Sequence, residues 1–418
     1  MTRVPSPTVA LGVAGALALA TFVGIGPTAT AQTDVLGEDA RPAYVAGAAR
    51  FPPDTASALR ILVRAHAAGN PQTRADIDFV LRLWRTHGRH GQPIGRRRTV
   101  ARTLRVNAWW YRSHQAPGDR IIVSDPDGII STYWEGRGLG VNPVATTGRW
   151  QGLNAGVPVE RLAEALLPLA VKRRGAGRSF LLWEYYDVPD RPEAIRPGAS
   201  GMAQGRVAQL MARAYHRTGE PRFAHAAGGA LRAFLVGVKA GGVESRVVYP
   251  PGTRSRAWYV ERAYPGEDPW KGAALNGFMV SLLNLKATAP LLHSLPRARP
   301  DAAPGAPRPK QAPGAVILAQ LAEDLGDRGV LTLRHHLPLH DTGSWSLYGL
   351  LTPGYGWRGF EADAGYHCYH VELLRQIALA WPRRGFANVA LRWEGYARRR
   401  GVSCKEGSRD DSASTVAG

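Results

Sequence analysis

Apolar residues recur at every third or fourth position through much of the chain, which is the spacing of one face of an α-helix. Residues 55–68 and 75–86 each form one apolar stripe. The same spacing continues near residues 98–113 and over residues 158–173. The pattern therefore predicts a series of amphipathic helices in the first half of the chain.

Residues that begin and end helices mark the next elements. Ser200 precedes an apolar stripe as an N-cap residue, and Gly219 follows it as a C-terminal stop. A partner helix is expected from Pro221 to about Val238. The periodicity predicts further helices over residues 272–288, 315–328, 366–380 and 386–399.

Short β-like pieces and loops separate these helices. Residues 180–186 indicate a short strand or a buried segment, and residues 244–250 and 256–265 indicate further β-like pieces. Residues 290–313 are rich in proline and predict an extended surface loop. Residues 401–418 predict a disordered tail.

Together these elements predict a mainly α fold. About ten helices in antiparallel pairs, joined by long loops that carry short β-hairpins, are typical of an α/α toroid. Residues 183–400 are expected to form this toroidal domain, and residues 32–182 to form a helical N-terminal region that is part of it. In such a fold the inner helices surround an apolar floor, and the loops at one end build a cleft.

The first residues are expected to be absent from the mature protein. Val9 to Gly26 form an apolar run that ends in small residues, and Ala29-Thr30-Ala31 fits a cleavage site before Gln32. Residues 1–31 therefore predict a secretory signal peptide, with a retained membrane anchor as the alternative. The expected location is secreted or cell-surface, with no stable membrane span after cleavage.

The chain is strongly basic, with a formal net charge of +20 and a sequence pI near 10.5. An exported protein meets little nucleic acid, so an acidic polysaccharide or an anionic cell surface is the expected partner. Solvated arginines at helix ends, as at residues 96–98 and 398–400, are the alternative explanation. The two cysteines leave two options: Cys368 and Cys404 form a pair, or Cys368 is a small buried hydrophobe.

Aromatic and polar residues are concentrated between Leu339 and Val371, although Phe, Trp and Tyr make up only 8% of the whole chain. Flat rings with interleaved polar tips suit a sugar, because a pyranose has an apolar C–H face and a rim of hydroxyls. A buried aromatic core is the alternative. The stretch contains Asp341, Trp345, Tyr348, Tyr355, Trp357, Tyr366, His367, Tyr369 and His370.

A series of ordered motifs makes the chain similar to a known family. The motifs are SGMAQG (200–205), Trp258-Tyr259 with Glu261 and Tyr264-Pro265, LNGFM (275–279), LPLHDTGSWSLY (337–348) and YHCYHVELL (366–374). Over residues 183–396 the chain resembles the C-terminal catalytic domain of D-glucuronyl C5-epimerases, which invert C5 of glucuronic acid within heparan-type polysaccharides. The resemblance implies an isomerase, an α/α toroidal domain and a cleft for uronate chains.

The resemblance implies catalytic roles for Tyr264, Tyr348 and Tyr366, with Glu261 near the first of them. Animal members carry a glutamate directly before the first tyrosine, whereas two residues separate Glu261 from Tyr264 here. They also carry an arginine where this chain has Leu351. Their large N-terminal β-domain has no counterpart visible in the sequence.

The chemistry of such a reaction explains why tyrosines are expected. A uronate C5–H is weakly acidic, so an enzyme must neutralise the neighbouring carboxylate and hold a base on one ring face and an acid on the other. The ordinary pKa of a tyrosine is about 10, and a nearby cation lowers it. Glu261 is the alternative base, and Arg254, Arg256 and Arg262 are candidates to bind the carboxylate.

No cofactor and no metal are expected. His367 and His370 share one helix face but lack a clear third zinc ligand, for which His340 or Asp341 are proposals. Residues 124–128 form a turn that begins like a calcium loop but has no closing glutamate. The residues predicted to bind substrate are Trp258, Tyr259, Arg262, Asn276, His367, His370, Gln204 and Trp345.

The sequence leaves several functions open. The first is a C5-epimerase that acts on a glucuronate-containing polymer such as heparosan. The second is a lyase, which begins with the same proton abstraction, or a hydrolase, which would need paired carboxylates among Glu184, Glu261, Glu361 and Asp363. The third is a polysaccharide-binding protein without catalysis. A homodimer is also an open option.

Overall fold

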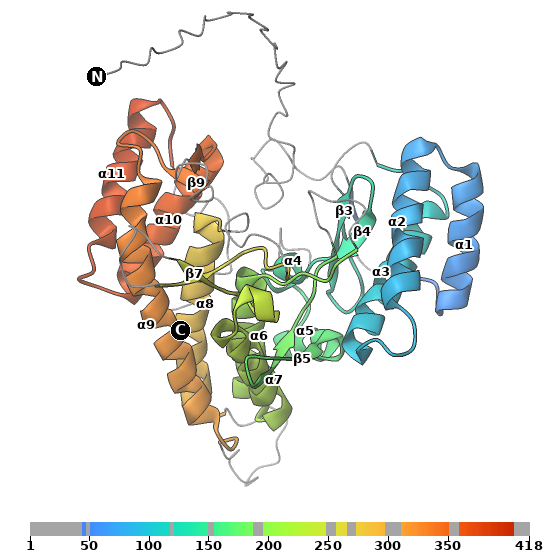
Figure 1. The fold of residues 1–418 in the computed structure, drawn as a ribbon, viewed down its shortest axis with the longest axis horizontal. Coiled ribbons are helices and arrows are strands. Elements are labelled where there is room, and N and C mark those ends of the chain that lie inside the picture. Colours follow the sequence, from blue (N-terminus) through green and yellow to red (C-terminus); the bar gives the residue numbers. More distant parts are fainter. Residues whose placement is uncertain are drawn as a thin grey trace, which may run out of the picture.

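Figure 1 shows the fold in a computed structural model, which describes residues 44–46, 51–117, 121–148, 154–186, 195–247, 256–265, 273–296, 311–350 and 359–404. The predicted signal peptide, most of the Pro-rich segment and the tail from residue 405 lie outside the described residues. The same holds for Arg254, Leu351, Tyr355 and Trp357. Within the described ranges, every helix is too short or too polar to cross a membrane.

The first helices form a module of their own. They are α1 (Thr55–Ala68), α2 (Pro71–His87) and α3 (Ile94–Tyr111), close to the ranges that the apolar periodicity predicts. Asp54 caps α1 by accepting a hydrogen bond from the Ser57 N–H at 2.7 Å. Asn70 caps α2 in the same way through the Thr73 N–H, also at 2.7 Å. These caps satisfy backbone donors that have no partner inside a helix.

A small sheet completes this N-terminal module. Its strands are β1 (Tyr44–Ala46), β2 (Ile121–Ser124), β3 (Ile130–Trp134) and β4 (Gly138–Val141), in that spatial order. β1 runs parallel to β2, and the other pairs are antiparallel. The sheet is not predicted from the sequence, which indicates only helices and a turn for these residues. All residues of β2 are buried, so the strand lacks the polar and apolar alternation that signals a half-buried strand.

The module has its own apolar core, separate from that of the rest of the chain, with Leu62, Leu104 and Val123 among its buried residues. Asp76 of α2 lies inside it and accepts hydrogen bonds from the hydroxyls of Tyr111 at 2.6 Å and Tyr133 at 2.9 Å. Burial raises the pKa of Asp76 in spite of these hydrogen bonds.

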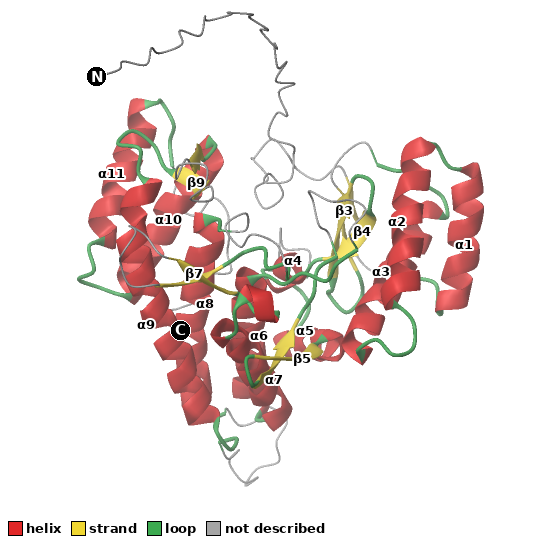
Figure 2. Ribbon diagram, in the orientation of Figure 1, coloured by secondary structure: helices red, strands yellow, loops and turns green. Residues whose placement is uncertain are grey.

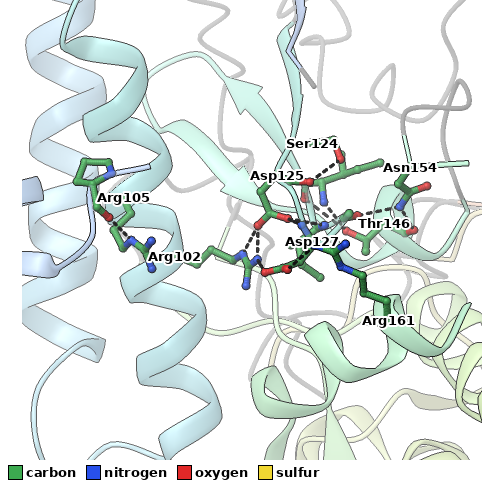
Figure 3. A network of polar contacts seen from close by, with 12 residues as sticks. Arg102, Arg105, Ser124, Asp125, Asp127, Thr146, Asn154 and Arg161 are labelled. Atoms are coloured by element: carbon green, nitrogen blue, oxygen red, sulfur yellow. Dashed lines mark hydrogen bonds and ion pairs between the residues drawn. The ribbon is translucent and has the colours of Figure 1, made fainter. Parts of the chain in front are cut away.

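The predicted turn at residues 124–128 is present, and Arg102 of α3 closes it (Figure 3). Arg102 Nε donates to Asp125 Oδ2 at 2.6 Å, and its Nη2 donates to Asp127 Oδ2 at 3.1 Å. Asp125 Oδ1 accepts from the N–H groups of Asp127 and Ile129 at 3.0 and 2.9 Å. These carboxylates therefore hold the turn to α3. Among the described residues, no group of three or more His, Cys, Asp or Glu side chains is placed to hold a metal ion.

A connecting region leads from the module to the larger helical part. It contains α4 (Pro143–Thr147), α5 (Val159–Leu166) and a hairpin of β5 (Val171–Gly175) and β6 (Arg178–Leu182). The helix expected over residues 158–173 ends at Leu166 instead. Pro168 lies two residues after this end and has no N–H to donate to the helical ladder.

Helix hairpins form the larger part of the molecule, as the red ribbons of Figure 2 show. Their first helices, called the inner helices here, pack in one row in which α8 contacts both α6 and α10. Each inner helix also packs against the helix that follows it. The prediction of a mainly α fold with antiparallel helix pairs is confirmed. The helices are α6 (Gly201–Thr218), α7 (Pro221–Arg232), α8 (Leu275–His293), α9 (Ala315–His336), α10 (Ala364–Ala380) and α11 (Phe386–Arg399).

The last hairpin is closed by a disulfide. Cys368 in α10 and Cys404 after α11 are bonded, with their Cα atoms 5.0 Å apart. Of the two options that the sequence left for these residues, the structure contains the pair. The bond joins an inner helix to the segment beyond its outer partner.

A buried ion cluster joins the N-terminal module to the β5–β6 hairpin and the segment that follows it. Glu184, which is 1% exposed, accepts hydrogen bonds from Arg96 of α3 at 2.9 Å, Arg173 of β5 at 3.0 Å and the Tyr186 hydroxyl at 2.7 Å. Burial by itself would raise the pKa of Glu184, but the Arg96 hydrogen bonds and the Arg173 charge outweigh it and hold this pKa below its ordinary value. The charged carboxylate thus belongs to the framework.

We expect Glu184→Gln to lower the midpoint of thermal unfolding. The change leaves two mostly buried guanidinium groups without their counter-charge, which costs about 3–5 kcal/mol. Calorimetry of the variant and the wild type measures this effect. Glu164→Gln is the matched control, because Glu164 pairs with Arg222 at the surface and losing such a pair costs about 1 kcal/mol or less. Equally small shifts in both variants would contradict the role of Glu184.

Candidate active site

Segments that lie far apart in the sequence meet at the starts of the inner helices. Isolated antiparallel bridges connect them, between Tyr185 and Gly198, between Ala199 and Ala263, and between Ala274 and Gly349. The Gly201 N–H also donates to the Val260 carbonyl at 2.7 Å. We call this set of segments the rim, defined as residues 183–186, 198–201, 258–264, 273–277, 346–350 and 359–366.

Each inner helix begins at the rim. Ser200 caps α6, and Asp363 caps α10 by accepting a hydrogen bond from the Tyr366 N–H at 2.7 Å. Helix α8 begins directly after Ala274, which is a rim bridge residue. The N-terminal end of a helix carries a partial positive charge, so several such ends together favour an anionic group at the rim.

Tyr348 and Tyr366 contact each other within the rim. Tyr348 lies in β9 (Leu347–Leu350), and Tyr366 lies in the first turn of α10. Their ring centroids are 4.5 Å apart and their planes meet at 66°, which is an edge-to-face contact. Phe360 of β10 (Gly359–Glu361) lies 5.2 Å from the Tyr348 ring. Two of the predicted catalytic tyrosines therefore form a direct pair.

Tyr264 and Glu261 lie after β8 (Arg256–Tyr259), the strand that pairs with β7 (Glu244–Val247). The Tyr264 ring covers Gly198, where an added Cβ would lie 2.1 Å from ring atom Cε1. Glu261 reaches the first turn of α8, where a Cβ on Gly277 would lie 2.5 Å from Glu261 Oε2. Only glycine permits these close approaches. The rim thus brings Tyr264 to the start of α6 and Glu261 to the start of α8.

Arginine and asparagine side chains stand close in sequence to Glu261 and Gly277 in the rim. Arg256 of β8 and Arg262 beside Glu261 are partly exposed, whereas Arg254 lies outside the described residues. Asn276 is 1% exposed and adjoins Gly277, the residue that Glu261 contacts. Its Oδ1 has no hydrogen-bond partner within the described part of the chain.

Ser346 joins the two elements that carry the tyrosine pair. Its N–H donates to His367 Nδ1 at 3.2 Å, so Nδ1 is the acceptor and His367 Nε2–H donates to the Trp393 carbonyl at 2.9 Å. Ser346 Oγ lies 2.8 Å from His367 Nδ1 and 3.0 Å from His370 Nδ1. The start of β9, and with it Tyr348, is thereby fixed against the helix that carries Tyr366.

Further buried histidines lie beside Trp258. His340 Nδ1 donates to the Leu347 carbonyl at 3.2 Å, and the Trp258 ring stacks on His340 with 5.8 Å between centroids. Burial lowers the pKa of His340 to about 4 and lowers the pKa of His370 well below its ordinary value. Burial likewise lowers the pKa of His367, although its hydrogen bond to the Trp393 carbonyl opposes the shift. These histidines are neutral supports of β9 at pH 7.

Other predicted substrate-binding side chains are engaged by the backbone. Gln204, which is 0% exposed, accepts from the Trp183 N–H at 3.1 Å and donates to the Leu181 carbonyl at 2.8 Å. Tyr259 and Trp345 each donate to a backbone carbonyl, at 2.9 and 2.7 Å. These hydrogen bonds attach the three side chains to the backbone of neighbouring segments. Their role in substrate binding stays a prediction.

Asp341 is bonded to α11. Its carboxylate accepts hydrogen bonds from Arg392 at 2.6 Å, Trp393 Nε1 at 2.9 Å and the Tyr396 hydroxyl at 3.1 Å. Burial alone would raise the pKa of Asp341, but hydrogen bonds from Trp393, the Gly343 N–H and Arg392 outweigh it and hold this pKa below its ordinary value. Asp341 also forms a β-bridge with the rim residue Ser346, so the carboxylate that the sequence offers as a metal ligand serves to attach this segment to α11.

Two contact residues are missed by sequence reasoning. Ser346 stands two positions before Tyr348. Residues two apart in a strand share a face, so this spacing could have predicted that Ser346 lies beside Tyr348. No sequence pattern around Phe360 predicts its contact. Its contact with Tyr348 arises only because β10 pairs with β9.

Comparison with known proteins places the rim within a described family region. Residues 182–395 match the family described as D-glucuronyl C5-epimerase C-terminus, which confirms the predicted resemblance and its extent. A D-glucuronyl C5-epimerase of Caenorhabditis elegans is 30% identical over 211 residues, which make up 50% of this chain and 30% of that relative. The chain therefore matches about a third of the relative's length. The N-terminal module lies outside the matched residues.

The buried histidines predict a pH dependence of stability. Their folded-state pKa values lie below the unfolded value of about 6.5, so the unfolded state binds more protons between these values. Their contribution to stability is therefore fully present above about pH 6.5 and is lost as pH falls toward about 4, the pKa of His340. We expect His340→Phe to flatten the fall of the thermal midpoint between pH 7 and pH 4.5.

The raised pKa of Asp76 changes stability in the opposite direction, but it does so in both proteins. The difference between the pH profiles of the variant and wild type therefore reports the contribution of His340. His335→Phe is the matched control, since His335 is an exposed histidine near the end of α9, five residues before His340. A pH profile of His340→Phe that coincides with those of wild type and His335→Phe would show that His340 is not held neutral.

Proposed function

The chain belongs to the D-glucuronyl C5-epimerase family, and on this basis we propose that it inverts C5 of D-glucuronate residues within an acidic polysaccharide. The matched residues make up only 30% of the relative's length, so the activity of this protein as a whole is part of the proposal. The observation that carries it is the direct contact of Tyr348 and Tyr366 on the rim that also holds Tyr264 and Glu261.

The reaction needs a base and an acid on opposite faces of the sugar ring. One tyrosine removes the C5 proton and another returns a proton to the opposite face, so that only the configuration at C5 changes. Tyr264 comes from a different rim segment than the Tyr348–Tyr366 pair, and a ring bound between these segments meets a hydroxyl on each face. Glu261 is the alternative base beside Tyr264.

The carbanion at C5 requires charge neutralisation. It forms next to a carboxylate that is already negative, so cations and backbone donors must face this carboxylate. Arg256 and Arg262 lie on the segment that carries Glu261 and Tyr264, and their planar guanidinium groups suit a carboxylate. The N-terminal ends of α8 and α10 add partial positive charge.

The proposed substrate is a glucuronate-containing polymer, with unsulfated heparosan as the first candidate. The net charge of +20 supports a polyanionic partner. Export by the N-terminal signal segment is part of the proposal, since such polymers lie outside the cytoplasm. A homodimer is compatible with the proposal and is not required by it.

Three of the four carboxylates considered for a hydrolase are engaged within the fold. Glu184 lies in the ion cluster with Arg96 and Arg173, Glu361 pairs with Arg400 at 3.2 Å, and Asp363 caps α10. These contacts do not favour a hydrolase. A lyase shares the first proton abstraction, so the product of the reaction separates it from an epimerase.

We expect the mature protein, incubated with heparosan in deuterated water, to introduce deuterium at C5 and to produce iduronate signals in the proton NMR spectrum. Tyr348→Phe and Tyr366→Phe should each reduce this exchange by about 100-fold or more, because they remove a proton-transfer group. Tyr215→Phe is the matched control. Tyr215 lies within the inner helix α6, where its hydroxyl accepts from the Ala312 N–H.

Each other outcome has a distinct meaning. An unsaturated C4–C5 product would identify a lyase, and binding without exchange would identify a carbohydrate-binding protein. Exchange at wild-type rate in both tyrosine variants would remove this pair from the mechanism. Tyr264→Phe then tests whether Glu261 or Tyr264 serves on the other face, since loss of exchange in this variant assigns the role to the tyrosine.

A further inference from the structure

One exposed aromatic ring stands beside the tyrosine pair. Among the large apolar side chains that are exposed within the described residues, Phe360 is the single aromatic one, and the others are leucine, isoleucine and valine. Phe360 is 45% exposed, whereas Tyr348 is 8% and Tyr366 is 3% exposed. The rings contact one another in the order Tyr366, Tyr348, Phe360, with centroid distances of 4.5 and 5.2 Å. This series runs from the interior to the surface, and Phe360 forms its outer end.

The exposure of Phe360 would mean little by itself, because single apolar side chains are common on protein surfaces. Its position distinguishes it from the others. The most exposed of them, Leu379 and Ile317, lie at the ends of α10 and α9 that are remote from the rim. Phe360 lies on the rim and against a candidate catalytic side chain. A ligand that covers its open face would remove apolar surface from water, which folding alone leaves exposed.

Strand β9 holds the ring in place. Phe360 pairs with Gly349, and a Cβ on Gly349 would lie 3.6 Å from Phe360 Cε1, so the ring covers the backbone of this glycine. Gly349 is in turn bridged to Ala274, the residue directly before α8. The ring is therefore fixed between rim segments before any ligand binds, which reduces the entropy cost of binding.

A shift in strand register directs the ring toward Tyr348. In a regular antiparallel pair, Phe360 would share a sheet face with its partner Gly349, and Tyr348 would point to the opposite face. The register shifts between Phe360 and Glu361, so that Glu361 pairs with Leu347. Such irregularities re-aim side chains and are frequent next to active sites. Here the shift accompanies the contact of the Phe360 ring with Tyr348.

The charge beside the ring is balanced. Glu361 forms an ion pair with Arg400 at 3.2 Å, and the Arg400 guanidinium lies 4.3 Å from the centroid of the Trp345 ring. A carboxylate without a counter-charge at this place would repel an anionic chain. The ion pair therefore leaves the surface next to Phe360 compatible with a polyanion.

The proposed mechanism decides which sugar meets this ring. Both faces of the reacting glucuronate are in use at C5, because the base and the acid approach from opposite sides. An aromatic ring that covered either face would exclude one of the proton-transfer groups. The partner of Phe360 is therefore a neighbouring residue of the same chain, whose apolar C–H face suits the open side of a phenyl ring.

We propose that Phe360 is a stacking platform for the sugar residue next to the reacting glucuronate, and that it thereby positions the polymer at Tyr348 and Tyr366. The identity of the polymer rests on the proposed function. The platform makes a separate statement, that affinity for the chain depends on a flat ring at position 360.

Binding of heparosan oligosaccharides to the whole protein, measured by isothermal titration calorimetry, tests the proposal together with KM and kcat for deuterium exchange. Phe360→Leu keeps apolar bulk over Gly349 but removes the flat ring. It should weaken binding and raise KM by about three- to tenfold, the usual contribution of a stacked aromatic ring. The loss should appear in KM more than in kcat, because a stacked neighbouring sugar is held equally in the ground state and the transition state.

Phe360→Tyr restores a flat ring and should return the affinity to the range of wild type. Leu379→Ala serves as the control, since it removes exposed apolar surface at the far end of α10. Thermal midpoints show that each variant is folded. Wild-type affinity and KM in Phe360→Leu overturn the platform. So does a fall of kcat at unchanged KM, which would mean that the ring only positions Tyr348, and so does a failure of Phe360→Tyr to restore binding.

The calorimetric measurement needs no turnover, so it separates the platform from the proposed function. A loss of affinity in Phe360→Leu that Phe360→Tyr reverses, without deuterium exchange in wild type, would retain the platform in a binding protein and reject the epimerase. Exchange in wild type with equal affinity and KM in Phe360→Leu would retain the epimerase and reject the platform. Heparosan that neither binds to wild type nor exchanges would overturn both.

Discussion

The common direction of the inner helices is the constraint on which the candidate site depends. Because α6, α8 and α10 all begin at the rim, the loops that precede them meet there and pair through backbone bridges. This pairing satisfies backbone donors and acceptors that would otherwise be buried without partners. It also leaves the helix starts directed at one surface, where their partial positive charges add. Under the proposed function, this arrangement favours an anionic substrate and a carbanion.

Most buried charges of the described residues serve the framework rather than the chemistry. Glu184 of the first rim segment is bound by Arg96 of the N-terminal module and Arg173 of the connecting region, and Asp341, which bridges the rim residue Ser346, is bound to α11. His340 and His370 are held neutral by burial and support the strand that carries Tyr348. With these groups engaged, the proton-transfer groups that the proposed mechanism uses are the rim tyrosines and Glu261, whose contacts lie at the starts of the inner helices.

The N-terminal module is attached to the first rim segment. It folds around its own core, yet the ion cluster at Glu184 and the hydroxyl of Tyr185 connect it rigidly to the first rim segment. Under the proposed function this connection fixes the position of the first rim segment, which carries Tyr185 and lies next to the Gly198 that the Tyr264 ring covers.

The sequence by itself determined the helices, their caps and the mainly α class, because apolar periodicity and capping residues act locally. It also pointed to Tyr264, Tyr348, Tyr366 and Glu261 through motifs that stand in order along the chain. Only the tertiary structure decided which of these side chains touch, since the contact between Tyr348 and Tyr366 depends on β9 docking against α10. The sheet of the N-terminal module and the partners of Gln204 and Asp341 were likewise decided there. Such contacts join residues that are distant in sequence, and no local pattern records which distant backbone a buried strand or a polar side chain will meet.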